Sequence, residues 1–301
     1  MEENKPLFCF VHATDLHYEI GNNPEVPEAN DRIFCLINDI NHLSEKEPLE
    51  FVIFTGDITN KGSANIDELS KIRSLLDNNL KVPYYVIAGN HDLAPNRKIA
   101  ASYPGKEDYH EGIIETSNYA RIFNNGIKFS FQRCGYNFIG FSLRDKDPDG
   151  ILDWVEHKIE RTKGRIILIS HYGLYPARDA GPMYKWDFVR IGSLIPRLRE
   201  IVNRKNKVIL YLYGHNHINS VLVKDGIYHI SSGGIQKGCT GYRLFKCYKN
   251  RIETSFFLLS DTSLHNFEYW NKDGICIDSH HHTSLEYHRG NEKEQNFIIK
   301  V

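Results

Sequence analysis

Histidines, aspartates and one asparagine occur in five short motifs, each of which follows an apolar segment of the chain. Two histidines two positions apart could be incidental in a loop, but five such motifs together indicate a common site. The apolar segments are residues 8–13, 51–54, 82–88, 166–169 and 208–212. The motifs that follow them are Asp15-Leu16-His17, Gly56-Asp57, Gly89-Asn90-His91-Asp92, Ser170-His171 and Gly214-His215-Asn216-His217. If these segments are strands whose ends meet at one edge of a sheet, their polar side chains gather in one pocket.

The side chains in these motifs are typical ligands of transition metals. Imidazole and carboxylate together suit borderline ions such as Mn, Fe, Zn, Co or Ni. Asp57 has two carboxylate oxygens and could bridge two ions, whereas Asn90 offers a neutral amide oxygen. Two ions roughly 3.5–4 Å apart can clamp a phosphoryl group and lower the pKa of a bridging water that attacks phosphorus. His91, beside Asn90, is placed to donate a proton or hydrogen bond to the departing oxygen or to a phosphate oxygen.

Each motif also has a simpler structural interpretation. Asp15 and Asp57 could cap helices that follow their strands, and His171 alone could be a hydrogen-bonded surface histidine. Asp92 could orient His91 or serve only as a turn residue, and the sequence leaves these two alternatives open. We favour metal ligation because the motifs occur together.

Other histidines lie outside these motifs. His12 is inside the first apolar segment, so we expect a core histidine there. The run His280-His281-His282 lies in a polar part of the chain, where a solvated loop is the expected structure rather than a metal site.

The segments between the motifs indicate alternating strands and helices. Apolar residues recur at helical spacing from Ile33 to Leu43 and from Ile66 to Leu80, between the first three predicted strands. This order is typical of a parallel sheet with right-handed crossovers. Further helices are predicted around residues 152–159 and within 183–203, and hairpins over 127–143, 220–231 and 242–259. The change to antiparallel strands after Ser220 suggests a second sheet packed on the first within one domain.

In this order the five motifs resemble those of the calcineurin-like metallophosphoesterase superfamily, and they span residues 15–217. The resemblance implies an α/β fold of four layers, an αββα sandwich with two mixed β-sheets face to face and helices outside. It also implies two metal sites that share one carboxylate. The first site would comprise Asp15, His17, Asp57 and His217, and the second Asp57, Asn90, His171 and His215.

Two other segments are similar to the branch that contains class III cyclic-nucleotide phosphodiesterases. The first is residues 56–62, and the second comprises residues 230–234 and 241–244. No Asp-Arg-Gly follows Asp57, and Asp92 stands where the phosphoprotein-phosphatase signature has Glu. A dedicated Ser/Thr protein phosphatase is therefore disfavoured.

The resemblance implies a metal-dependent phosphoesterase, and we expect a phosphodiesterase acting on a small nucleotide-like substrate, or on one that resembles a lipid headgroup. Its cofactors would be two divalent or trivalent ions of Mn, Fe or Zn, with a bridging hydroxide as nucleophile. Asp57 and His91 are the expected catalytic residues, and His91, Asn60 and Asn216 are the expected substrate contacts. A phosphomonoesterase or nucleotide pyrophosphatase is the alternative within the family. An inactive metal-bound scaffold for protein interaction is the alternative of a different class.

The composition is that of a globular protein, with 41% apolar and 25% charged residues in 301. A formal net charge of -1 excludes a basic surface of the kind that drives general nucleic-acid binding. The six cysteines are scattered without paired spacing, which favours a reduced chain. No apolar run approaches the roughly 20 residues of a membrane span, and no signal-peptide pattern is present. We therefore expect a soluble, cytoplasmic protein.

The pattern also predicts how the chain is divided. Residues 1–260 are expected to form the metallophosphoesterase domain, with a cap or lid insert at 93–130 where the periodicity weakens. Residues 261–301 are polar, and we expect an irregular C-terminal extension.

Overall fold

The computed structural model describes residues 5–21, 28–93, 114–124, 127–177, 191–236, 239–265 and 288–301. Within these residues, twelve strands form two six-stranded sheets. The order in the first sheet is β12 (Asn296–Lys300), β11 (Arg251–Leu258), β10 (Gly241–Cys247), β1 (Phe8–Ala13), β2 (Leu49–Phe54) and β3 (Tyr84–Val86). The order in the second sheet is β4 (Lys128–Arg133), β5 (Tyr136–Phe141), β6 (Arg165–Ile169), β7 (Val208–Tyr213), β9 (Ile227–Ser232) and β8 (Asn219–Lys224).

An aromatic layer fills the space between the two sheets. Successive residues of a strand point to opposite faces, so Phe8 and Phe10 of β1 both face this layer. The ring of Phe10 stacks on Phe245 of its own sheet at 4.6 Å between centroids. It also meets the edge of Phe138, from the second sheet, at 5.4 Å. Burial of these large rings holds the sheets face to face.

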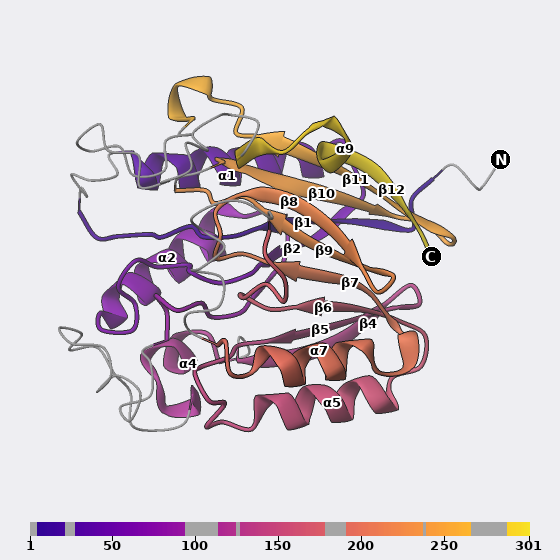
Figure 1. Cartoon of the computed structure of the whole chain (residues 1–301). Coiled ribbons are helices and arrows are strands. Elements are labelled where there is room, and N and C mark those ends of the chain that lie inside the picture. The colour runs from indigo at the N-terminus through magenta and orange to yellow at the C-terminus, as the bar shows by residue number, and fades with distance from the viewer. Residues whose placement is uncertain are drawn as a thin grey trace.

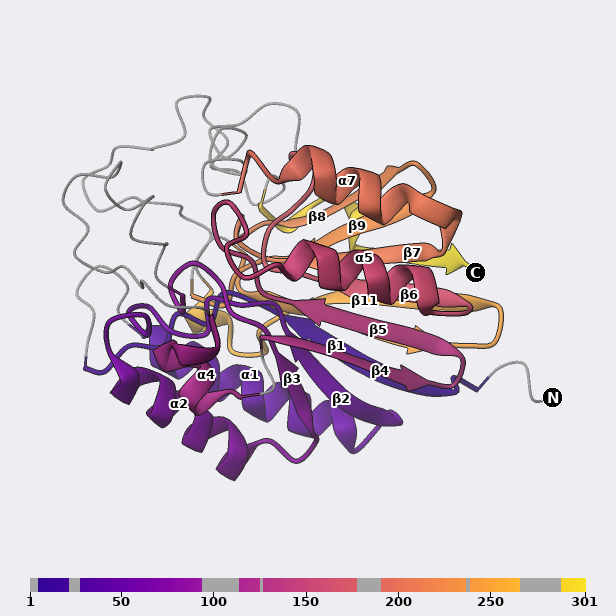
Figure 2. The same cartoon turned by 90° about the horizontal axis from the view of Figure 1, so that it is seen from below.

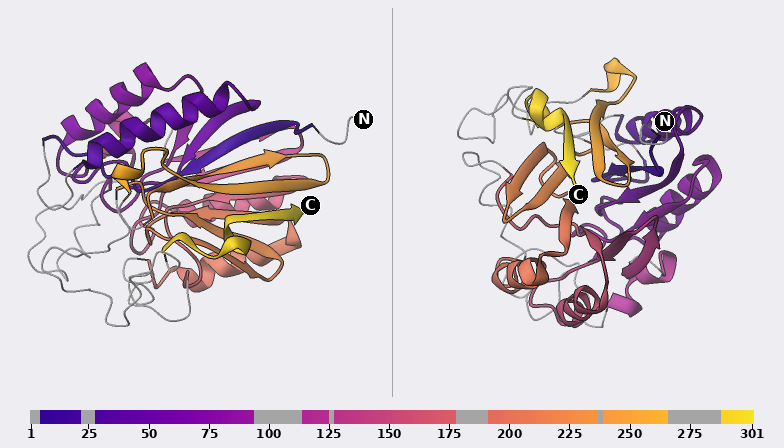
Figure 3. Two further views of the ribbon diagram at one scale, coloured as in Figure 1. Left: turned by 90° about the horizontal axis from the view of Figure 1, so that it is seen from above. Right: turned by 90° about the vertical axis from the view of Figure 1, so that its right-hand side faces the viewer.

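Helices cover the outer faces of both sheets (Figures 1 and 3). Helices α1 (Ala29–Ser44) and α2 (Ile66–Asn79) lie outside the first sheet. Helices α5 (Ile151–Arg161) and α7 (Ile195–Asn203) lie side by side outside the second, as the view from below shows (Figure 2). The outward residues Cys9, Val11 and Ala13 belong to the same apolar cluster as Ile33 of α1. The predicted αββα sandwich of two mixed sheets is thus confirmed.

The second sheet does not consist of the strands after Ser220, as the sequence suggested. It begins with β4 and β5, and the two later hairpins are divided between the sheets. Strand β9 pairs with β7, and β10 pairs with β1, so β8–β9 and β10–β11 extend different sheets. β1 and β10 are buried along almost their whole length, as is typical of interior strands, and β10 lies between β11 and β1 in the first sheet.

The end of the chain is ordered, which corrects part of the predicted irregular extension. Helix α9 (Glu292–Gln295) begins with a capping box in which Asn291 and Glu294 bond each other's backbone. Strand β12 then pairs with β11 in antiparallel register. The buried guanidinium of Arg243 holds this segment by donating to the carbonyl oxygens of Glu294 and Gln295, at 2.6 and 3.2 Å. A strand of five residues leaves too short a pattern for sequence periodicity to reveal.

The predicted insert is described only in part, since residues 94–113 lie outside the described ranges. Within the remainder, a 3₁₀ turn (Ile114–Thr116) leads into α4 (Asn118–Ile122), which packs on α2. The Asn118 amide donates to the Ser63 carbonyl at 3.1 Å. The run at 280–282 also lies outside the described ranges. Among the helices that are described, none is both long and apolar enough to cross a membrane.

Candidate metal centre

The five motifs meet in one place, but they come from two sheets rather than from one edge of a single sheet. Asp15 and His17 follow β1, Asp57 follows β2 and Asn90 follows β3, all in the first sheet. His171 follows β6, and His215 and His217 follow β7, in the second sheet. The strands are parallel within each group, so their carboxyl ends lie together where the two sheets face each other.

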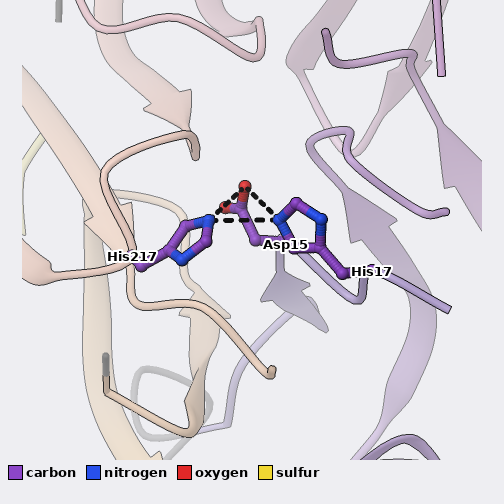
Figure 4. Close-up of side chains that lie close together, drawn as sticks. All are labelled: Asp15, His17 and His217. Carbon is purple, nitrogen blue, oxygen red and sulfur yellow. Dashed lines mark hydrogen bonds and ion pairs between the residues drawn. The ribbon is translucent and has the colours of Figure 1, made fainter. Parts of the chain in front are cut away.

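One half of the centre is formed by Asp15, His17 and His217 (Figure 4). The Nε2 atoms of the two histidines lie 3.2 Å apart. Asp15 Oδ1 is 3.3 Å from His217 Nε2 and 3.8 Å from His17 Nε2. Ligands placed about 2.1 Å from one ion would be separated by roughly 3.0–3.4 Å, so these atoms are close to the geometry of a metal site.

The orientation of Asp15 is fixed by its neighbours. Its Oδ2 accepts from the Thr14 hydroxyl at 2.8 Å and from the His215 backbone N–H at 3.0 Å. Gly214 permits this close approach, because a Cβ there would overlap the Thr14 hydroxyl and lie 2.7 Å from Asp15 Oδ2. Asp15 Oδ1 is the oxygen that faces the histidines.

The second half is formed around His171. Its Nε2 lies 3.2 Å from Asn90 Oδ1 and 3.2 Å from Asp57 Oδ2. Its Nδ1 donates to the Thr55 carbonyl at 2.8 Å, which leaves Nε2 to face a metal. His215 belongs to the same cluster, with its ring centroid 5.1 Å from that of His171.

Asp57 connects the two halves. Its Oδ1 accepts from the His91 backbone N–H at 2.7 Å. Its Oδ2 lies 3.2 Å from His171 Nε2 on one side and 3.8 Å from His17 Nε2 on the other. A single carboxylate oxygen is therefore shared by both clusters, which is the arrangement expected for a bridge between two ions.

Five of the predicted ligands have a left-handed backbone that is uncommon for residues with a side chain. Their φ values are 54° for Asp15, 45° for His17, 48° for Asp57, 72° for His215 and 54° for His217. Such strain persists only where the surrounding structure imposes it, and it concentrates at functional sites. The turns at these strand ends are thus shaped to aim ligand side chains inward.

The family model for calcineurin-like phosphoesterases matches residues 9–219, which include all of these ligands. The chain belongs to this family. A protein named as a probable glycerophosphodiester phosphodiesterase, from Arcobacter nitrofigilis, is 27% identical over 61% of this chain and 62% of its own length. A probable cyclic nucleotide phosphodiesterase of Xenorhabdus bovienii is 29% identical over 36% of this chain and 42% of its own length. This chain thus spans less than two-thirds of either relative.

The fold is also shared with solved structures. A dimetal phosphatase from Danio rerio superposes with a TM-score of 0.54 and covers 84% of this chain and 96% of its own. Its sequence identity is 15%, so this likeness concerns the fold alone. In this calcineurin-like phosphoesterase, the two facing sheets therefore have the family's architecture.

The charges of the centre suit a pair of cations. Burial would raise the pKa of Asp15, but the neighbouring His217 and His171 together outweigh it and the pKa falls to about 2. Burial would likewise lower the pKa of His171, but Asp57 raises it to about 9. Burial lowers the pKa of His215 to about 3 and that of His17 well below its usual value. His17 and His215 therefore present lone pairs at neutral pH, whereas a cation must displace a proton from His171.

The three predicted substrate contacts differ in how far they are buried. His91 is half-buried and lies against His17, with ring centroids 4.6 Å apart. Asn60 is also half-buried, and its side chain donates to Glu19 Oε2 at 3.0 Å. Asn216 is completely buried, and neither polar atom of its amide has a partner among the described residues. Contact between Asn216 and a substrate stays a prediction that would require this side chain to become exposed.

Asp92 has a role that neither interpretation of the sequence included. It is completely buried, and its two oxygens accept from the backbone N–H groups of Ile58, Thr59 and Gly89 at 2.9–3.0 Å. Its Oδ1 also accepts from the Thr59 hydroxyl at 2.7 Å. Asp92 thus ties the turn after β2 to the turn after β3. The sequence signal was its position directly after His91, but four donors cannot be read from spacing.

Proposed function

We propose that this protein is a hydrolase that uses two metal ions to cleave phosphodiester bonds of a small, nucleotide-like substrate. The observation that carries this proposal is the position of Asp57 Oδ2, which faces ligand histidines from both sheets. The residues present fit two ions, with Asp15, His17, Asp57 and His217 around one, and Asp57, Asn90, His171 and His215 around the other. Bound Mn, Fe or Zn ions supply Lewis-acid activation of the phosphoryl group and of the attacking water.

The burial of the site residues indicates the side from which a substrate phosphate can approach. Asp15, Asp57, His17, His171 and His217 are buried, whereas Asn90, His91 and His215 are partly exposed. A phosphate can therefore enter from the side of His91. There the His91 imidazolium would donate its Nε2 proton to the oxygen that leaves, while its Nδ1–H donates to the Asn60 carbonyl at 2.8 Å.

A diester is favoured over a monoester because both curated relatives described above are named as phosphodiesterases. Hydrolysis rates for matched mono- and diesters of 4-nitrophenol separate these activities. A strong preference for the monoester would replace our proposal with a phosphomonoesterase. The five cysteines within the described ranges are free, in keeping with the cytoplasmic location that we also propose.

The decisive test is Asp57→Asn. This change keeps the size of the side chain but weakens the shared oxygen as a ligand, so we expect hydrolysis of bis(4-nitrophenyl) phosphate to fall by about 1000-fold. Metal analysis should show fewer than two ions per chain. Asp67→Asn, on the exposed first turn of α2, is the matched control and should retain both ions. Full activity in Asp57→Asn would contradict the mechanism, and two bound ions without any turnover in the wild type would favour an inactive scaffold.

A further inference from the structure

Asn60 connects His91 to a carboxylate that the family motifs do not include. On one side, the Asn60 carbonyl accepts from His91 Nδ1 at 2.8 Å. On the other, the Asn60 amide donates to Glu19 Oε2 at 3.0 Å. The carbonyl that meets His91 is the backbone carbonyl of Asn60, and the N–H of the same peptide group, that of Lys61, donates to Glu68 Oε2 at 2.8 Å. Glu19 holds the side chain of the same residue and so restrains the position of Asn60 as a whole.

Glu19 is itself anchored rather than loosely exposed. The amide of Asn30, in the first turn of α1, donates to the Glu19 carbonyl at 2.9 Å. The preceding residue, Tyr18, forms a parallel bridge with Thr59, and its carbonyl accepts from the Asn60 backbone N–H at 2.9 Å. Only 13% of the Glu19 side chain is exposed. A carboxylate held in this way can act as a fixed acceptor.

The other partner of the Glu19 carboxylate, Lys61, is exposed to solvent. Lys61 approaches Glu19 Oε1 at 2.5 Å, but 61% of the lysine side chain is exposed. Exposed ion pairs contribute little, with a median of about 0–1 kcal/mol. The hydrogen bond from Asn60, rather than the ion pair with Lys61, is therefore the contact that connects Glu19 to the site.

The contact with Asn60 also determines how His91 is presented. A carbonyl can only accept, so His91 Nδ1 carries the hydrogen and the ring cannot turn without losing this bond. Nε2 is then the nitrogen available to the site. A ring nitrogen of His91 lies within 4.8 Å of ligand atoms of both Asp57 and His17.

We infer that Glu19 is a positioning residue, which keeps His91 in place for proton donation by restraining Asn60, the residue whose backbone carbonyl His91 contacts. This inference rests on the proposed function of His91. In the step concerned, the attacking hydroxide oxygen forms a bond to phosphorus while the bond from phosphorus to the leaving oxygen breaks. The leaving oxygen takes the electron pair of that bond and the Nε2 proton of the His91 imidazolium, which becomes neutral. The Nδ1 hydrogen stays on the ring and continues to donate to the Asn60 carbonyl. Glu19 would act only through Asn60 and would contact neither substrate nor metal.

The test compares leaving groups that differ in their need for a proton. Bis(4-nitrophenyl) phosphate releases a stable phenolate, whereas diphenyl phosphate releases a more basic one. We expect Glu19→Ala to lower kcat for diphenyl phosphate by about 10–100-fold, and to lower kcat for the nitrophenyl ester by only a few-fold. Glu19→Gln should restore most of the rate, because its amide oxygen still accepts from Asn60. Lys61→Met removes only the exposed partner and should stay within about twofold of the wild type.

Three results would overturn the inference: no loss in Glu19→Ala, an equal loss for both esters, or no recovery in Glu19→Gln. Metal content and thermal midpoint, measured for every variant, identify a loss caused by unfolding or by lost ions. His91→Ala separates this inference from the proposed function. If His91→Ala shows the selective loss and Glu19→Ala does not, only the positioning role fails. If His91→Ala keeps full activity on both esters, the proposed proton donor fails as well.

Discussion

His12 shows how a single buried residue links the two sheets. It belongs to β1, and its Nε2 bonds the Thr55 hydroxyl at 2.9 Å while its Nδ1 bonds the Ser232 hydroxyl of β9. It is completely buried, as expected from its place inside an apolar segment. Burial, together with the nearby Arg243, lowers the pKa of His12 to about 3. The imidazole is therefore neutral in the folded protein at physiological pH.

This shift predicts a pH dependence of stability. The unfolded chain binds a proton at His12 near pH 6.5, whereas the folded chain does so only near pH 3, so the unfolded state binds more protons in between. The stability contributed by the neutral His12 is therefore fully present above about pH 6.5. As the pH falls, this contribution is lost by up to about 1.4 kcal/mol per pH unit. We expect the difference in unfolding free energy between wild type and His12→Gln to shrink from pH 7 to pH 4.5. Urea titrations measure it, and a constant difference would contradict this account.

At the scale of single residues, the side chains that lie together in the two clusters are ones that the sequence singled out, because ligand types and strand ends are both visible in it. Their role as metal ligands stays a prediction. It did not predict which oxygen of Asp57 is shared, since that depends on the His91 N–H that occupies the other oxygen. Glu19 was missed for a similar reason. Its loop contains two prolines and no periodicity, and its contact with Asn60 spans 41 positions.

At the scale of elements, the centre depends on how neighbouring turns are joined. The turn after β2 and the turn after β3 carry Asp57 and Asn90, and Asp92 holds them together through four hydrogen bonds. The β1 turn joins the same group, because the Asp15 N–H donates to the Gly56 carbonyl at 3.1 Å. These hydrogen bonds hold the predicted ligands in place through the turns themselves, which would reduce the cost of ordering them around a metal.

Asp92→Asn tests this connection between turns. The amide would turn its own N–H groups toward at least one backbone N–H, leaving buried donors without acceptors at a cost of about 1–3 kcal/mol. We expect a lower urea midpoint and weaker metal binding, although Asp92 ligates nothing. Calorimetric titration with Mn²⁺ checks the second effect. Asp67→Asn, on the exposed first turn of α2, is the control. Equal behaviour of the two variants would argue against a role of Asp92 in holding the turns together.

Most elements were predictable because their periodicity is strong, as in α1, α2 and α5. The division of strands between the sheets was not predictable, because each hairpin after Ser220 has the same local pattern whichever sheet it extends. Pairing of β10 with β1 joins residues more than 230 positions apart, and only tertiary packing decides between such partners. Strand β12 was missed because it is short and follows a polar segment.

At the scale of the whole molecule, we expect metal binding and folding to be coupled, because each half of the centre includes predicted ligands from both sheets. A ligand that binds only the folded state stabilises it by about 2.7 kcal/mol at 100 times its dissociation constant. We therefore expect removal of metal with a chelator to lower the thermal midpoint by roughly 5–10 °C, and added Mn²⁺ to restore it. Differential scanning calorimetry measures the shift. Asp57→Asn should respond far less, and an unchanged midpoint in the chelated wild type would refute the coupling.

The shared oxygen of Asp57 has a consequence for life in the cell. Two metal ions held by ligands from both sheets would link the sheets to each other, so a shortage of metal would lower the stability of the fold as well as the activity. Newly made chains would fold more slowly and unfold more often, and proteases would cleave the unfolded chains. Metal supply would then govern how many copies of the protein survive, as well as how many are active.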